Sequence, residues 1–191
     1  MSFLDVPDSS LGHLRLPWGW CLTATQLRQA TLCSIDLPQL VGDVGSTSAF
    51  SSLTALYQWG PTDHLDSSVL ARCLALQRLT LEVGYLAKGE LAALSPLTSL
   101  AELVFHECEL PGSAADAAQP QAFSALTSLT YLSFSCTWAH PAIVSQLIQL
   151  PAVRKLHINH STLDAEAGDD ALPLGPWLKN LEELTVQGSV G

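Results

Sequence analysis

Histidine and acidic residues are the first candidates for a metal site, and their spacing decides whether they can form one. His157 and His160 lie three residues apart, which in a strand points them to opposite faces. His106 has an equivalent place in another expected strand, but one whole strand separates it from His157, a gap of about 10 Å. A metal–nitrogen bond is only about 2 Å long. The acidic stretch Asp164–Asp170 lacks calcium-loop spacing. We therefore expect no metal site and a solvated acidic loop.

The chain also lacks the motifs that identify common enzymes. It contains no G-x-S-x-G turn for a nucleophilic serine and no H-E-x-x-H pair for zinc. It has neither G-x-x-x-x-G-K-[ST] nor G-x-G-x-x-G, the loops that hold phosphates. We therefore predict that the protein is not an enzyme and uses no cofactor.

Charge excludes two classes of partner. The 191 residues include 8 lysines and arginines and 18 aspartates and glutamates, a formal net charge of −10. Nucleic acids and anionic membranes are bound through clustered basic residues. We therefore expect no nucleic acid and no membrane among the partners.

Cysteine use and the first residues predict the compartment. The five cysteines are odd in number, widely spaced and without a C-x-x-C pair: Cys21, Cys33, Cys73, Cys108 and Cys136. This favours buried free thiols in a reducing compartment. The chain starts without the basic and apolar segments of a secretory signal. We predict a cytoplasmic protein, with a cytoskeletal or ciliary association as a narrower alternative.

An internal repeat defines the elements that must position these residues. Leu97-Thr98-Ser99-Leu100 recurs as Leu126-Thr127-Ser128-Leu129, and each copy leads into the same apolar spacing. Five copies begin at positions 76, 100, 129, 153 and 181, in steps of 24, 29, 24 and 28 residues. The Leu-x-Leu core of each copy has the period of a strand with one buried face. Neighbouring copies must stack, because one copy cannot bury its own leucines. Between two of them, Pro141 to Leu150 is predicted to be a helix that starts with proline.

The pattern L-x-x-L-x-L-x-x-(N/C)-x-L resembles the leucine-rich repeat, whose period is about 20 to 29 residues. The resemblance implies an α/β solenoid with a parallel sheet on its concave face and short helices or irregular segments on its convex face. We expect one domain over 1–191, with clear repeats over 76–191 and degenerate repeats or an N-terminal cap over 1–75. In the copy at Leu53 and Leu56, Gln58 takes the third apolar place.

The sequence departs from the family pattern after each strand. The asparagine or cysteine position holds Gly84, Cys108, Thr137, Ser161 and Ser189, of which only Cys108 is of the expected type. We therefore predict loose and irregular hydrogen bonding between turns.

The resemblance also implies that the residues between the leucines face the concave side and bind a partner protein. Tyrosine and tryptophan there are typical interface anchors, and charged residues surround them. The predicted partner-binding residues are Tyr57, Trp59, Arg78, Glu82, Glu102, His106, Tyr131, Lys155 and His157. An alternative for Trp59 is that it fills a gap in the core.

The predicted function is a non-catalytic scaffold that binds another protein through the concave face. One alternative is a structural element of a cytoskeletal or ciliary assembly, which stacks through an uncapped C-terminal end. Another is the substrate-reading part of a ubiquitin ligase adaptor.

Overall fold

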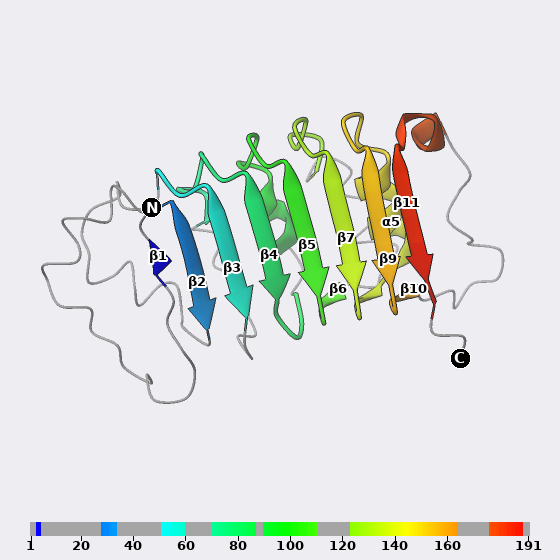
Figure 1. The fold of residues 1–191 in the computed structure, drawn as a ribbon, viewed down its shortest axis with the longest axis horizontal. Coiled ribbons are helices and arrows are strands. Elements are labelled where there is room, and N and C mark those ends of the chain that lie inside the picture. The colour runs from blue at the N-terminus through cyan, green and yellow to red at the C-terminus, as the bar shows by residue number, and fades with distance from the viewer. Residues whose placement is uncertain are drawn as a thin grey trace, which may run out of the picture.

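One parallel sheet organises the molecule (Figure 1). The computed structural model describes residues 3–4, 28–33, 51–59, 70–86, 90–110, 123–163 and 176–188. Eight strands follow one another in the sheet in chain order. They are β1 (Phe3–Leu4), β2 (Gln29–Cys33), β3 (Ala55–Trp59), β4 (Arg78–Glu82), β5 (Glu102–His106), β7 (Tyr131–Ser135), β9 (Lys155–Asn159) and β11 (Glu183–Gln187). The predicted parallel sheet is confirmed.

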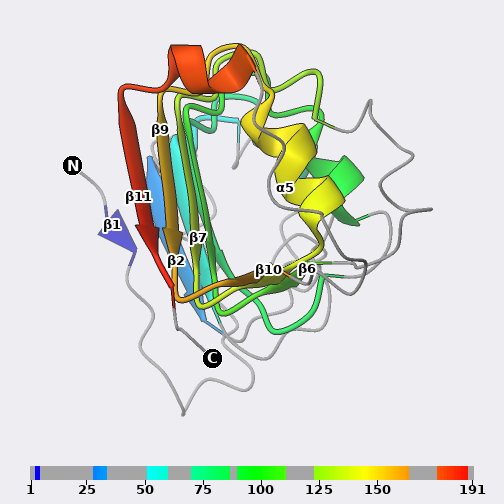
Figure 2. The same ribbon diagram turned by 90° about the vertical axis from the view of Figure 1, so that its right-hand side faces the viewer.

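The remaining elements lie around the other sides of the core (Figure 2). A second parallel sheet joins β6 (Glu109–Leu110), β8 (Trp138–Ala139) and β10 (Thr162–Leu163). The helix α5 (Pro141–Ile148) lies across the core from the large sheet. Two 3₁₀ helices, η2 (Glu90–Leu94) and η3 (Pro176–Asn180), complete the described return segments.

In-register pairing lines the apolar side chains up into columns. Leu79, Leu103, Leu132 and Leu156 are direct partners across four strands and are all fully buried. The next inward column continues through Leu81, Phe105, Phe134 and Ile158. The rings of Phe105 and Phe134 stack with centroids 5.5 Å apart. Each strand therefore buries its leucines against the strand before and the strand after it.

The weaker upstream copies join the same sheet. β2 and β3 pair over five residues, and β3 pairs with β4 over five. Gln58 takes its place in the second inward column, opposite Leu81, and is buried. The expected copy at Leu11 to Leu16 lies outside the described residues.

The predicted helix after His140 is confirmed, although it ends two residues before Leu150. Pro141 is its first residue, where a missing N–H costs nothing. The His140 carbonyl accepts hydrogen bonds from the N–H groups of Ile143 and Val144. Ile143, Val144, Leu147 and Ile148 form its buried face.

Backbone bonds extend the sheet past the ends of three strands. Glu107, Cys136 and His160 each follow a strand and have φ near +50°. Their N–H groups donate to the last strand residue of the next turn: Glu107 to Ser135, Cys136 to Asn159 and His160 to Gln187. The left-handed residue turns the chain toward the second sheet while its N–H continues the ladder.

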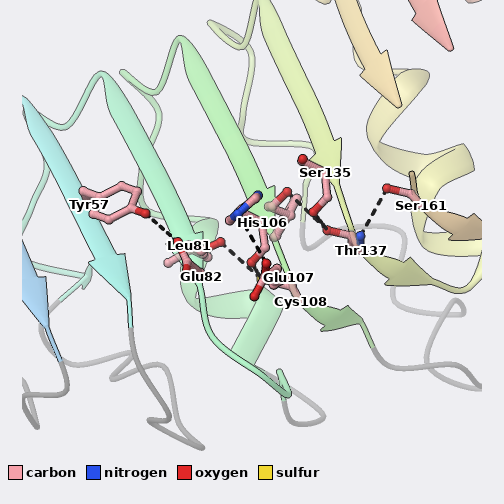
Figure 3. Close-up of polar contacts among 10 residues, drawn as sticks. Tyr57, Leu81, Glu82, His106, Glu107, Cys108, Ser135, Thr137 and Ser161 are labelled. Atoms are coloured by element: carbon pink, nitrogen blue, oxygen red, sulfur yellow. Dashed lines mark hydrogen bonds and ion pairs between the residues drawn. The ribbon is translucent and has the colours of Figure 1, made fainter. Parts of the chain in front are cut away.

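Side chains at three of the positions after the strands, Cys108, Thr137 and Ser161, strengthen this ladder (Figure 3). The Cys108 thiol donates to the carbonyl of Leu81, 3.2 Å away in the preceding turn. The Thr137 hydroxyl lies 3.2 Å from the carbonyl of Phe105 and 3.1 Å from that of Ser135. Ser161 accepts from the Thr137 N–H and donates to the Asn159 carbonyl. The prediction of loose hydrogen bonding is therefore wrong at Thr137 and Ser161, because their hydroxyls reach carbonyl groups of the same or a neighbouring turn. Ser189 lies outside the described residues.

Thr137 provides a test of this ladder. Thr137→Val keeps the shape but removes a buried hydroxyl, and we expect it to lower the free energy of unfolding by about 1–2 kcal/mol. Thr130→Val is the matched control, because the Thr130 hydroxyl donates to the Ala101 carbonyl from an exposed residue. That change should stay within about 0.5 kcal/mol of wild type. Urea unfolding followed by circular dichroism measures both, and equal losses would contradict the buried ladder.

The expectation of buried free thiols holds for two cysteines and fails for a third. Cys73 and Cys108 are buried, and burial raises the pKa of each from 9.0 to about 11. Cys136 is exposed. Its backbone is left-handed, so its side chain does not follow the alternation of buried and exposed residues along the strand. The side chains of Cys21 and Cys33 lie outside the described residues.

Thiol labelling distinguishes these sites. A rise of two pKa units alone lowers the thiolate fraction about a hundredfold, and burial further restricts access. We expect iodoacetamide to modify Cys136 at least about a hundredfold faster than Cys73 or Cys108. Peptide mapping by mass spectrometry resolves each site, with urea-unfolded protein as the control in which the rates converge. Equal rates in the folded protein would contradict the assigned burial.

Candidate functional site

Alternation along each strand divides the large sheet into a core face and a face turned away from the core, here called the open face. Along β4 and β9 the second and fourth residues are buried, while the first, third and fifth are partly or fully exposed. The predicted concave-face residues all fall on these odd positions. Arg78 and Lys155 are exposed, and the half-buried ones are Tyr57, Glu82, Glu102, His106, Tyr131 and His157. Trp59 lies in β3, but its side chain is outside the described part of the structure.

Four side chains from β7, β9 and β11 form one hydrogen-bonded group, here called the β7–β11 cluster: Tyr131, Lys155, His157 and Glu183. The Tyr131 hydroxyl lies 3.2 Å from Nδ1 of His157, and the two rings meet edge to face with centroids 5.0 Å apart. Nε2 of His157 lies 3.0 Å from Oε1 of Glu183. Nζ of Lys155 lies 3.0 Å from the other carboxylate oxygen. The carboxylate of Glu183 therefore binds the His157 ring through one oxygen and the Lys155 ammonium through the other.

Pairing shifts the pKa values of Glu183 and Lys155 in this cluster. The hydrogen bond from Lys155, followed by that from His157, lowers the pKa of Glu183. The hydrogen bond to Glu183, followed by its negative charge, raises the pKa of Lys155. A lowered carboxyl pKa stabilises the fold above its ordinary pKa, and that contribution is lost as the pH falls. Both side chains are about half exposed, at 50% and 44%, so solvent screens the pair. Its main effect is to fix positions rather than to stabilise the fold.

A separate pair, Tyr57 and Glu82, joins the middle of β3 to the C-terminal end of β4. The Tyr57 hydroxyl donates to Oε2 of Glu82 at 2.5 Å (Figure 3). Burial, this hydrogen bond and the charges of Glu82 and Glu107 raise the pKa of Tyr57 from 10.0 to about 12. Tyr57 therefore remains a neutral donor, and its ring is held against the open face.

The structure brings the predicted residues into two groups rather than one. Tyr57 and Glu82 form the first, while Tyr131, Lys155 and His157 belong to the second. Arg78 and Glu102 are direct partners on β4 and β5, in the outward column that continues through Tyr131 and Lys155. His106 ends β5, with Nε2 3.8 Å from Oε1 of Glu107.

Sequence reasoning missed the carboxylate that holds the second group together. Glu183 is in the same outward column as Lys155 and is its direct partner. Opposite charges at equivalent positions of consecutive repeats were the available signal.

The described residues do not contain a group of three or more histidine, cysteine or acidic side chains that could hold a metal ion. In the same part of the chain, no helix has the length and hydrophobicity needed to cross a membrane.

Solved structures resemble this arrangement. The leucine-rich repeat ectodomain of the plant membrane receptor kinase GASSHO1/SCHENGEN3 from Arabidopsis thaliana, in complex with CASPARIAN STRIP INTEGRITY FACTOR 2, matches with a TM-score of 0.52 and 17% identity. The match covers 83% of this chain and 17% of that chain. The chain has the leucine-rich repeat fold.

Other leucine-rich repeat structures match with lower scores. An internalin from Listeria monocytogenes has a TM-score of 0.46 and 16% identity, over 87% of this chain and 49% of that one. A leucine-rich repeat protein from Leptospira interrogans has a TM-score of 0.39 and 19% identity, over 73% and 38%. This solenoid thus spans about half of the internalin and about one sixth of the plant ectodomain. No protein-family model matches the chain, and no curated protein sequence matches it.

The raised pKa of Tyr57 gives a direct test of the first group. In the folded protein the pKa of Tyr57 is raised from 10.0 to about 12, so the phenol keeps its proton beyond pH 10. The contribution of the neutral phenol to the stability of the fold is therefore complete below pH 10 and is lost as the pH rises toward 12. We expect Glu82→Gln to lower the pKa of Tyr57, because it removes the negative charge beside the hydroxyl. Phenolate absorbance during an alkaline titration measures this, and Tyr57→Phe identifies the step among the three tyrosines. An unchanged titration in Glu82→Gln would contradict the pairing.

Proposed function

We propose that this solenoid is a non-catalytic scaffold that binds another protein through its open face. The supporting observation is the β7–β11 cluster, where side chains from three strands hold one another in place. Ordering long side chains on binding costs about 0.5–1.5 kcal/mol each. A surface that is already ordered avoids part of that cost.

The composition of the two groups supports a protein partner. Tyr57 and Tyr131 present aromatic rings whose hydroxyls are already hydrogen-bonded. Aromatic anchors surrounded by polar side chains are typical of interface hot spots. The cations near them, Arg78 and Lys155, are balanced by Glu82, Glu102 and Glu183, which favours a partner of mixed charge over a polyanion.

The cluster geometry favours binding over catalysis. Tyrosine, histidine and glutamate in a chain resemble a nucleophile, base and orienting acid. Nδ1 of His157 is next to Tyr131, and Nε2 is engaged with Glu183. However, Glu183 is 44% exposed and also paired with Lys155, whereas the orienting acid of a catalytic triad is buried.

The assembly alternative is supported by a separate observation at β11. Leu184 and Val186 of this strand are 49% and 63% exposed. An apolar strand edge of this kind favours association with another chain. A cytoplasmic location remains a prediction for either function.

Affinity capture from a cell lysate with mass spectrometry tests the open-face proposal. We expect wild type to capture a protein that the triple variant Tyr57→Ala, Tyr131→Ala, His157→Ala retains at least about tenfold less well, since each anchor residue contributes about 1–2 kcal/mol or more. Circular dichroism checks that the variant is folded.

Tyr85→Ala provides the matched control for this capture. Tyr85 is 46% exposed and lies beyond β4, in the turn that bridges to Glu109, and not on the open face. It should capture the partner as wild type does. Equal capture by the triple variant, or equal loss in both variants, would reject the open face as the binding surface.

A further inference from the structure

The last strand leaves core positions uncovered. Leu184 and Val186 of β11 pair directly with Leu156 and Ile158 of β9. The β9 residues are 0% and 4% exposed, whereas Leu184 and Val186 are 49% and 63% exposed. β11 ends the described sheet (Figure 1), so among the described strands it has a neighbour on one side only, β9.

Part of the backbone of β11 also presents hydrogen-bonding groups to this outer edge. The Glu183 N–H donates to Arg154, and the Gln187 carbonyl accepts from His160, so both residues turn their backbone groups toward β9. Successive residues of a strand alternate in this direction. Leu184 and Val186 therefore present their N–H and C=O groups to the outer edge. The same two residues offer apolar side chains and backbone hydrogen-bonding groups.

We propose that two copies of this chain associate through β11, antiparallel to each other, with the two-fold axis at Thr185. This register places Leu184 of one copy opposite Val186 of the second copy, and the reverse. Both are residues with outward backbone groups, so each opposed pair exchanges two hydrogen bonds, and the two pairs form four. Leu184 and Val186 of the two copies then form one apolar layer that faces the core side of the sheet and continues across the two-fold axis.

Charge favours this register. Glu183 comes opposite Gln187 of the second copy, and not opposite an acid. The two Glu183 carboxylates are four residues apart along the edge, about 13 Å, which exceeds the screening length of about 8 Å at physiological salt. Each is also paired with Lys155 and His157 in its own chain. Moving the axis to Leu184 would place Glu182 opposite Val186 and lose one apolar match.

A closed pair also matches the two edges in length. Each copy contributes the same five residues of β11, Glu183–Gln187, so the two paired edges can satisfy one another.

Sedimentation velocity over a concentration series tests the association. We expect the mass to rise from 20.4 kDa toward twice that value. Val186→Lys should raise the dissociation constant at least about tenfold, because an edge lysine opposes strand pairing. Leu74→Lys is the matched control, since Leu74 is 57% exposed and lies outside β11, and it should associate as wild type does.

A cysteine at the axis tests the register. Thr185 faces its own copy as a pair without hydrogen bonds, with Cα atoms about 4.5 Å apart, which is within disulfide range. Under mild oxidation, Thr185→Cys should form a covalent dimer at least about tenfold faster than Thr80→Cys, the equivalent position on the interior strand β4. A monomer at all concentrations, equal crosslinking of the two variants, or species that grow beyond a dimer would each overturn the proposal.

Discussion

No turn of this molecule can bury its own apolar side chains, and this constraint determines the rest of the structure. Leu132 is fully buried because Leu103 and Leu156 flank it on the two adjacent strands. In a parallel sheet, such a contact requires exact register, since a slip of one residue would turn every leucine to the other face. The bonds beyond the strand ends maintain that register. Thr137, for example, reaches back to Phe105, 32 residues earlier in the chain. The core and the hydrogen-bond ladder therefore specify the same alignment.

The same register assembles the open face from residues that are distant in sequence. A side chain meets those about one repeat away, not its neighbours in the chain. Lys155 and Glu183 are direct partners, whereas other polar contacts run diagonally. Tyr57, for example, is the direct partner of Thr80 but bonds Glu82, two residues further along β4. Tyr131 and His157 are related in the same way, and His157 and Glu183 are displaced in the opposite direction. Diagonal neighbours on one face of a sheet are within reach of aromatic and long side chains. Rigid strands thus set the spacing, and side-chain length decides which groups meet.

This explains which features the sequence could predict. The apolar columns and the helix from Pro141 follow from period and position, which are visible in the chain. Outward placement of Tyr131 and His157 follows from the same alternation. The diagonal bonds do not, because they depend on rotamers that a column alignment does not contain. The ion pair of Lys155 with Glu183 could have been predicted, because the two residues are direct partners in one column. Cys136 was predicted to be buried but lies at a left-handed residue, where alternation no longer applies. Thr137 was underestimated because its hydroxyl is also a donor and reaches a carbonyl of the preceding turn.

The two surfaces have different relations to the fold. Side chains of the open face bond one another above a core that is already complete, so a partner bound there adds contacts without adding to the ladder. An interior strand such as β9 has a neighbour on each side, whereas β11 has one within the described sheet. A chain bound at β11 would therefore bury Leu184 and Val186 as Leu156 and Ile158 are already buried. In a repeat protein, stability comes largely from contacts between nearest neighbours. Binding at the edge would therefore stabilise the last turn through the same burial of apolar side chains that holds the other turns together. Binding at the open face would involve only its surface side chains.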